Sequence, residues 1–228
     1  MRFIRACSAA FVFSASLAGP AKACDLALAL AVDVSGSVDA REYRVQMDGL
    51  AAGLRDPVIT EALVRGQAQL SLIQWSGSSR QETTIGWTRM LGFADVEAVA
   101  RKIETAPRPW RNFSTAVGEA LLHSAEMFRS AADCKRKIID ISGDGPSNEG
   151  IEPAAIRHRI QNLGVTVNAI AIEASEPDLT AYFFENVIQG EGAFVITATD
   201  FEDYPSRIRR KLLKEVAQQT AFLSHSLK

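Results

Sequence analysis

Three oxygen-bearing side chains follow an apolar segment near the start of the sequence, at alternate positions. Residues 26–32 are all apolar, and Asp33, Ser35 and Ser37 come directly after them. An unbroken apolar run of this length is typical of a strand that is buried on both faces of a parallel sheet. Alternate side chains of extended backbone point to one side. One carboxylate and two hydroxyls could therefore meet at one hard cation.

These residues resemble a known metal-binding motif. The segment Asp33-Val-Ser35-Gly-Ser37 resembles the Asp-x-Ser-x-Ser signature of the metal-ion-dependent adhesion site (MIDAS) in von Willebrand factor type A (VWA) domains. That family has a second loop with Thr-x-x-Gly-x-Ala-Leu, and residues 115–121 read Thr-Ala-Val-Gly-Glu-Ala-Leu. It has Asp-Gly in a third loop, matched here by Asp144-Gly145. The resemblance covers about residues 25–215 and points to bacterial secreted single-domain VWA proteins of unknown function.

The resemblance implies a metal site with five side-chain ligands, which are Asp33, Ser35, Ser37, Thr115 and Asp144. All five are hard oxygen donors. The set therefore favours Mg²⁺, with Mn²⁺ or Ca²⁺ as alternatives, over zinc or copper, which draw on His or Cys. An octahedral ion takes about six ligands, so at least one position stays open. The family's binding mode implies a protein partner that fills this position with an Asp or Glu carboxylate.

Each of these residues also has an interpretation without metal. Thr115 or Ser114 could cap the helix that follows, and residues 144–148 have good turn chemistry. The sequence also departs from the family in two places. Phe113-Ser114 stands where common members have Gly-Gly, and Gly143 precedes Asp144 where they have Thr. The metal and loop interpretations both remain open for single residues, but three motifs in the family's order favour the metal site.

Apolar patterns along the chain predict strands that alternate with helices. The predicted strands are residues 26–32, 67–75, 82–90, 137–142, 165–172 and 193–197. The predicted helices are residues 40–54, 93–105, 115–131, 152–163, 178–187 and 201–222. This alternation indicates an α/β protein with a doubly wound sheet and helices on both faces.

The six-stranded sheet is expected to be mostly parallel, with strand 3 antiparallel. The link between residues 67–75 and 82–90 is too short for a parallel crossover, which needs about a dozen residues. The VWA resemblance implies the strand order 3-2-1-4-5-6, a VWA/Rossmann-like fold. Ligands of such sheets bind beyond the carboxyl ends of the strands, where the winding direction reverses. This rule selects the strands that end near Asp33 and Asp144.

The N-terminal residues 1–23 have the features of a secretory signal peptide. Arg2 and Arg5 precede the apolar residues 6–18, and Ala21-Lys-Ala23 matches a cleavage site. Residues 24–228 then form one VWA-like domain of an exported protein, periplasmic or extracellular after cleavage. No later apolar segment is long enough to cross a membrane, so no integral membrane segment is expected after processing.

Two cysteines remain after the predicted cleavage, Cys24 and Cys134. They lie nine residues before Asp33 and ten residues before Asp144. If the two strands are parallel neighbours, both sulfurs fall at the same edge of the sheet, and a disulfide is expected in an export compartment. Two unpaired thiols are the alternative. A lipid anchor on Cys24 is also open, although Lys22 beside the cleavage site disfavours it.

Charge and residue types limit the possible functions. The formal net charge of −2 gives no support for nucleic-acid binding. The favoured function is an exported metal-dependent binding module. A metal-dependent hydrolase is one alternative, with Glu149 as the nearest base candidate, but no His or Cys is placed as base or nucleophile. A structural subunit of an envelope assembly, with a non-functional metal site, is the other.

Two more features need a position in the fold. Trp75 ends a predicted strand and could lie near the rim of the site or pack in the core. Residues 207–214 form a basic run, Arg-Ile-Arg-Arg-Lys-Leu-Leu-Lys. We interpret this run as the solvated face of the last helix, because Ile208, Leu212 and Val216 form an apolar stripe. Attraction to an anionic surface is the alternative.

Overall fold

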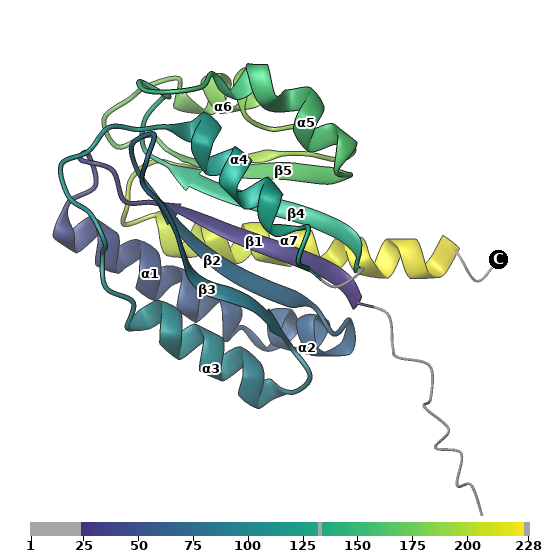
Figure 1. Cartoon of the computed structure of the whole chain (residues 1–228). Coiled ribbons are helices and arrows are strands. Elements are labelled where there is room, and N and C mark those ends of the chain that lie inside the picture. Colours follow the sequence, from purple (N-terminus) through teal and green to yellow (C-terminus); the bar gives the residue numbers. More distant parts are fainter. Residues whose placement is uncertain (1–23, 132–133, 226–228) are drawn as a thin grey trace, which may run out of the picture.

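The computed structural model describes residues 24–131 and 134–225, with side chains up to residue 217. The predicted signal peptide lies outside these residues. One six-stranded sheet has the order β3-β2-β1-β4-β5-β6, and only β3 is antiparallel to its neighbour (Figure 1). The strands are β1 Cys24–Asp33, β2 Gln69–Trp75, β3 Gln81–Arg89, β4 Cys134–Gly143, β5 Val165–Ile172 and β6 Val195–Ala198. The predicted fold class and strand order are confirmed.

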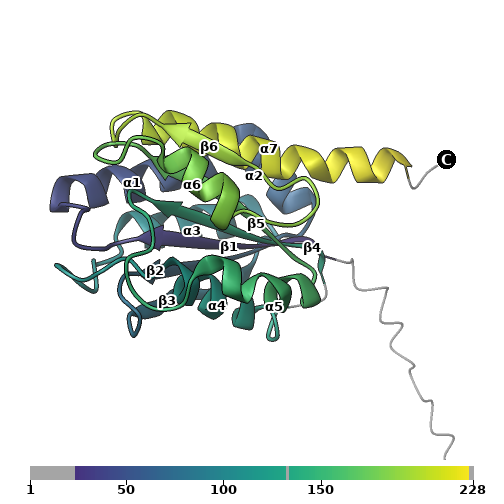
Figure 2. The same cartoon turned by 90° about the horizontal axis from the view of Figure 1, so that it is seen from above.

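Helices cover both faces of the sheet (Figures 1 and 2). One face packs against α1 Ala40–Leu54, α2 Pro57–Arg65, α3 Phe93–Glu104 and α7 Tyr204–His225. The other face packs against α4 Val117–Met127, the short 3₁₀ turn η1 Pro153–Ile156, α5 Arg157–Asn162 and α6 Leu179–Asn186. None of the helices in the described part of the chain combines the length and apolar character needed to cross a membrane.

Strand β1 lies in the centre of this sandwich, which explains its unbroken apolar sequence. Leu26, Leu28 and Leu30 pack in the core on the α1 side. The alternating Ala27 and Ala29 pack in the core on the α4 side. Because both faces of β1 are covered, polar residues are confined to its carboxyl end.

Helix α1 begins with a complete capping box. The Asp39 side chain accepts hydrogen bonds from the backbone N–H groups of Arg41 and Glu42, at 2.7 and 2.8 Å. The Glu42 carboxylate accepts a 2.7 Å hydrogen bond from the Asp39 N–H in return. Asp39 therefore pairs the free backbone N–H groups at the start of α1. Asp33, Ser35 and Ser37 are not needed for capping.

Three helices differ from the sequence prediction. One is α4, which covers Val117–Met127 instead of the predicted 115–131. Helix α2 was not predicted, although Asp56 caps its N-terminus by accepting hydrogen bonds from Val58 and Ile59, and Pro57 is its first residue. An Asp-Pro pair is a start signal for a helix, and this one is short enough to be taken for a loop. The predicted helix over residues 152–163 is divided into η1 and α5.

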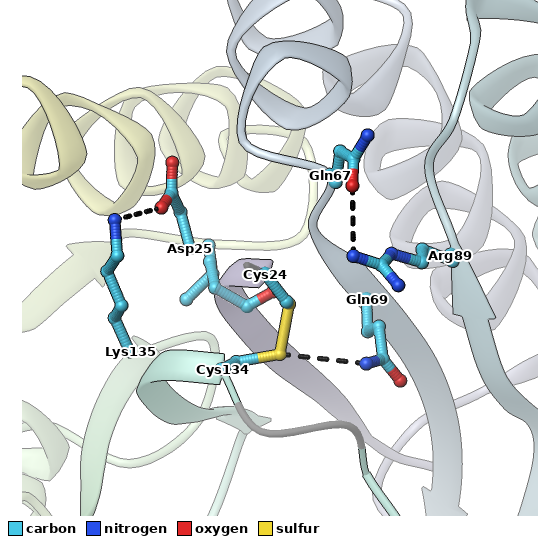
Figure 3. Close-up of a disulfide and its surroundings, with 8 residues drawn as sticks. Cys24, Asp25, Gln67, Gln69, Arg89, Cys134 and Lys135 are labelled. Carbon is cyan, nitrogen blue, oxygen red and sulfur yellow. Dashed lines mark hydrogen bonds and ion pairs between the residues drawn. A yellow bond between two sulfur atoms is a disulfide. The ribbon is translucent and has the colours of Figure 1, made fainter. Parts of the chain in front are cut away.

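The predicted disulfide joins β1 to β4. Cys24 and Cys134 are direct neighbours in the parallel ladder, with their Cα atoms 4.5 Å apart. Figure 3 shows the bridge with the ion pair between Lys135 and Asp25 beside it, at 2.8 Å. The bridge lies at the amino ends of both strands, opposite the end that carries Asp33.

The prediction for the basic run in α7 is wrong for Lys211. Its side chain is fully buried, and its ammonium nitrogen lies 2.5 Å from Asp140 Oδ1 and 2.8 Å from Glu215 Oε1. Asn168 on β5 donates a 3.1 Å hydrogen bond to Glu215. The lysine faces the sheet because Asp140 on β4 and Glu215 on α7 compensate its charge.

Candidate metal site at the carboxyl ends of the strands

Asp33 and Asp144 meet at the same edge of the sheet. Asp33 is the last residue of β1, and Asp144 follows directly after β4. The two strands are parallel neighbours, and Val32 pairs with Ser142 in the ladder. They flank the point where the strand order reverses, at which doubly wound sheets bind ligands.

Four of the five predicted ligands form one hydrogen-bonded chain. The Ser35 backbone N–H donates to Asp33 Oδ1 at 2.7 Å. The hydroxyls of Ser35 and Ser37 lie 3.2 Å apart, and the Ser37 hydroxyl donates to Asp144 Oδ1 at 2.7 Å. Asp33 and Ser35 are fully buried, and Asp144 is 6 % exposed. The first and third loops thus bring their oxygen atoms together.

One carboxylate oxygen in this cluster has no partner in the described structure. Asp33 Oδ2 is buried, and no group in residues 24–131 or 134–225 donates a hydrogen bond to it. A Cβ on Gly143 would stand 3.3 Å from this oxygen, so the glycine keeps the space beside it open. A buried carboxylate oxygen without a donor is unfavourable, whereas a bound cation would satisfy it. The residues present therefore fit a hard divalent ion.

The electrostatics of the two carboxylates agree with this fit. Burial, together with the charge of Asp144, raises the pKa of Asp33 to about 8. Burial also raises the pKa of Asp144, and the hydrogen bond from Ser37 opposes this shift. Ionisation of both Asp33 and Asp144 is unfavourable without a positive charge nearby. A divalent cation would supply that charge.

The loop that contains Thr115 is bonded to the loops after β1 and β4. The Asn148 side chain accepts a hydrogen bond from the Thr115 N–H, and the Asn148 N–H donates to the Thr115 carbonyl, both at 2.9 Å. The Gly36 N–H donates to the Phe113 carbonyl at 2.8 Å. The second loop is therefore bonded to both the first and the third, and Thr115 is buried within it.

Helix capping does not account for Thr115. The N-cap of α4 is Ala116, and the hydroxyl that bonds the start of the helix belongs to Ser147, which accepts a 3.3 Å hydrogen bond from the Val117 N–H. Gly118 is required for a different reason, because a Cβ there would lie 1.9 Å from the Ile151 carbonyl oxygen. This glycine lets α4 approach the third loop closely.

Sequence reasoning missed three residues that hold the site. Gln46 donates to the Asp33 carbonyl at 3.2 Å, and Arg108 donates to the Ser35 carbonyl at 2.7 Å. Asn148 clamps Thr115 as described above. The sequence could have indicated Gln46, because this polar residue interrupts the buried face of α1 that contains Met47 and Leu50. Arg108 and Asn148 lie in loops without periodicity.

Trp75 packs in the core, not at the rim. It is fully buried, and its ring lies next to Gly143, 3.6 Å from where a Cβ would stand. Phe113 is the more exposed aromatic residue, at 38 %, and the Arg80 guanidinium lies 3.6 Å from its ring centroid.

Within the described residues no three His, Cys, Asp or Glu side chains form a metal-binding cluster. A metal here would depend on hydroxyls as well as carboxylates.

Comparisons with known proteins place the chain in a family. Residues 23–220 match a family described as "Protein of unknown function (DUF1194)". No curated protein matches the sequence. Among solved structures, proximal thread matrix protein 1 from the mussel byssus, with a zinc-occupied MIDAS motif, is 22 % identical with a TM-score of 0.62, covering 88 % of this chain and 49 % of its own.

Two further structures share the fold at lower identity. The pilus adhesin SpaC from Lactobacillus rhamnosus GG is 14 % identical with a TM-score of 0.64, covering 86 % of this chain and 30 % of its own. A von Willebrand factor type A protein from Catenulispora acidiphila is 16 % identical with a TM-score of 0.58, covering 86 % of this chain and 43 % of its own. The chain thus spans half or less of the length of these neighbours. It has a VWA fold and belongs to the DUF1194 family of unknown function.

Proposed function

We propose that this protein is an exported binding module that captures a carboxylate of a partner protein through a divalent cation. Asp33, Ser35, Ser37, Thr115 and Asp144 would hold the ion, with Mg²⁺ as the expected metal. The observation that carries the proposal is the buried Asp33 Oδ2, which lacks a donor in the described structure beside the hydrogen-bonded chain from Ser35 to Asp144.

The donor set supports a cation that still accepts an outside ligand. Two carboxylates and three neutral hydroxyls supply five side-chain ligands, one fewer than the about six that an octahedral ion takes. A carboxylate from a partner is a hard, negatively charged ligand that would complete the shell. The bound ion would supply the electrostatic attraction, while Ser35 and Ser37 would orient it through their hydroxyls.

The neighbours in fold support an adhesion-type module in general terms. SpaC is a pilus adhesin, and the mussel byssus protein has a zinc-occupied MIDAS motif. The present site has no His or Cys among its five proposed ligands, which favours Mg²⁺ over zinc.

The disulfide supports export. Disulfides persist in oxidising compartments such as the periplasm and the extracellular space. Because one sulfur cannot carry both a disulfide and a lipid thioether, the Cys24–Cys134 bridge favours export without a lipid on Cys24. The signal peptide over residues 1–23 is part of the same proposal.

The hydrolase alternative receives no support from Glu149. Its carboxylate accepts a 2.7 Å hydrogen bond from the Ser78 hydroxyl, and this bond lowers the pKa of Glu149. A carboxylate with a lowered pKa is a weaker general base. The structural-subunit alternative differs from the proposal in one measurable property, because it requires no metal affinity.

Two measurements test the proposal. Calorimetric titration with Mg²⁺ should give saturable binding to the wild type and none to Ser35→Ala, while the exposed Ser79→Ala serves as a matched control that binds normally. A pull-down from envelope extract should then release its captured protein on addition of EDTA. Capture of the same protein by Ser35→Ala in EDTA, or a wild type that binds no divalent ion, would refute the function.

A further inference from the structure

Strand β6 leaves one edge of the sheet open, at a distance along the sheet from the candidate metal site. It is the terminal strand in the order, next to α7 (Figure 2). The Ala169 N–H donates to the Phe194 carbonyl, and the Glu173 N–H donates to the Ala198 carbonyl, at 3.0 and 2.9 Å. Even-numbered positions of the β6 segment therefore direct their backbone groups to β5.

The odd-numbered positions direct their backbone groups outward. Because the direction of N–H and C=O alternates along a strand, Val195 and Thr197 present two donors and two acceptors at the open edge. No hydrogen bond to these four groups occurs among the described residues. An open edge with alternating donors and acceptors is a template for another strand.

A groove of about 430 Å³ runs along this edge, between β6 and α7. Val195 and Thr197 line it on the strand side, and Arg207, Arg210 and Lys214 line it on the helix side. Arg207 is paired with Asp203 at 2.7 Å, and the Lys214 ammonium lies 3.7 Å from the centre of the Phe194 ring.

The groove carries excess positive charge. Asp203 compensates Arg207, but Arg210 is exposed and forms no ion pair with any described residue. Lys214 lies against an aromatic ring and forms no ion pair with a carboxylate of the described chain. The basic residues 209 and 211 of the same helix are occupied elsewhere, by Asp56 and by Asp140 with Glu215.

We propose that the groove is a second interaction surface, at which an extended acidic segment of a partner protein adds to β6 as a seventh strand. Its backbone would pair with Val195 and Thr197, and its carboxylates would face Arg210 and Lys214. Main-chain pairing gives such additions their affinity, and side chains give them specificity. A second copy of this chain is a poor occupant, because it would bring its own cations to the groove.

The cations of the groove and the outward backbone groups of β6 together favour a peptide over a lipid headgroup or free phosphate. A lipid headgroup or free phosphate would satisfy the cations and the outward N–H groups. It would leave the outward carbonyls of Val195 and Thr197 without donors. A strand supplies both donors and acceptors at the required spacing.

The experiment uses the peptide acetyl-(Val-Glu)₄-amide, whose alternation places all four carboxylates on one face of a strand. Binding to the isotope-labelled protein is followed by amide shifts and by hydrogen exchange. The Val195 and Thr197 amides should become protected on binding. The double substitution Arg210→Glu with Lys214→Glu should weaken affinity about tenfold or more, because it reverses both facing charges.

Three controls make the outcome decisive. Arg101→Glu with Lys102→Glu applies the same charge change to exposed positions on α3 and should leave affinity unchanged. Methylation of all valine nitrogens blocks one edge of the peptide strand, and methylation of all glutamate nitrogens blocks the other edge. A strand that adds to β6 uses one edge, so only one of the two methylated peptides should lose binding. EDTA should have no effect, which separates this surface from the proposed metal site.

Other results would overturn the proposal. Unprotected Val195 and Thr197 amides, equal binding by both methylated peptides, or an equal loss in the α3 control would each do so. Loss of peptide binding in EDTA would place the carboxylates at the metal instead. Binding to phosphatidylglycerol vesicles without binding to the peptide would assign the cations to a membrane surface.

Discussion

The Ser37 hydroxyl donates a 2.7 Å hydrogen bond to Oδ1 of Asp144, although 107 residues separate the two along the chain. This bond joins the loop after β1 to the loop after β4. It places a neutral oxygen donor and a carboxylate in direct contact, in the same cluster as the buried Asp33 Oδ2, which accepts no hydrogen bond from the described residues.

Ser37→Ala tests this contact. Loss of one hydroxyl ligand should reduce Mg²⁺ affinity about tenfold or more, equivalent to about 1.4 kcal/mol. Loss of the hydrogen bond alone should reduce the free energy of unfolding by only about 1 kcal/mol. Calorimetric titration and urea unfolding measure the two effects separately. An unchanged dissociation constant for Mg²⁺ would remove Ser37 from the ligand set.

Asp144→Asn should have opposite effects in the presence and absence of metal. The charge of Asp144 helps raise the pKa of Asp33, so its removal relieves repulsion in the metal-free protein, which should be at least as stable as the wild type. Saturation with Mg²⁺ at about 100 times its dissociation constant should stabilise the wild type by about 2.7 kcal/mol. The variant should show little of this gain. Thermal unfolding with Mg²⁺ and with EDTA measures this difference. An equal gain in stability from Mg²⁺ in the wild type and the variant would contradict the role of Asp144 as a ligand.

Removal of the disulfide should destabilise the fold without changing the candidate site. The bridge closes a separation of 110 residues, so the double substitution Cys24→Ser with Cys134→Ser should cost about 4.7 kcal/mol by the chain-entropy argument. The bridge and Asp33 lie at opposite ends of β1, so Mg²⁺ affinity of the folded variant should be unchanged. Free-thiol titration of the denatured, unreduced wild type is the direct check, and two thiols per chain would disprove the bridge.

Lys211→Met should be strongly destabilising. The substitution leaves Asp140 and Glu215 buried without their cation, and breaking a buried ion cluster in this way costs about 3 to 5 kcal/mol. Lys214→Met, one turn further along α7 and exposed, is the matched control and should change stability by less than about 1 kcal/mol. Urea unfolding of both variants tests the difference. Equal stability of the two would contradict the buried position of Lys211.

The same cluster should make stability depend on pH. Burial and the charge of Glu215 raise the pKa of Asp140 to about 7, while Lys211 opposes the shift. A carboxyl whose pKa is higher in the folded than in the unfolded chain binds more protons when folded. Its contribution to the free energy of unfolding therefore falls as pH rises from about 4 to about 7.

Asp140→Asn removes this titration. The difference in stability between variant and wild type should move in favour of the variant between about pH 4 and about pH 8. Urea unfolding across this range measures the difference, whatever the absolute cost of the substitution. A difference that stays constant with pH would show that Asp140 titrates normally.

Much of the fold follows from local pattern. Residues 26–32 read as a doubly buried strand because every side chain is apolar, and β1 lies in the centre of the sheet. The disulfide followed from counting back from Asp33 and Asp144, since parallel strands keep a constant register. Helix α2 was missed because a nine-residue helix leaves little periodicity, even with Asp56 and Pro57 at its start.

The sequence by itself determined the strand pattern, the order of the MIDAS-like motifs and the types of ligand atoms, because these depend on neighbouring residues. Only the tertiary structure decided which groups meet. Lys211 looks solvated in a basic helix until Asp140 on another element is placed against it. The sheet order and the loop packing bring Ser37 to Asp144. They also leave Asp33 Oδ2 without a donor in the described structure. Such contacts depend on atoms far apart in the chain, which local spacing cannot specify.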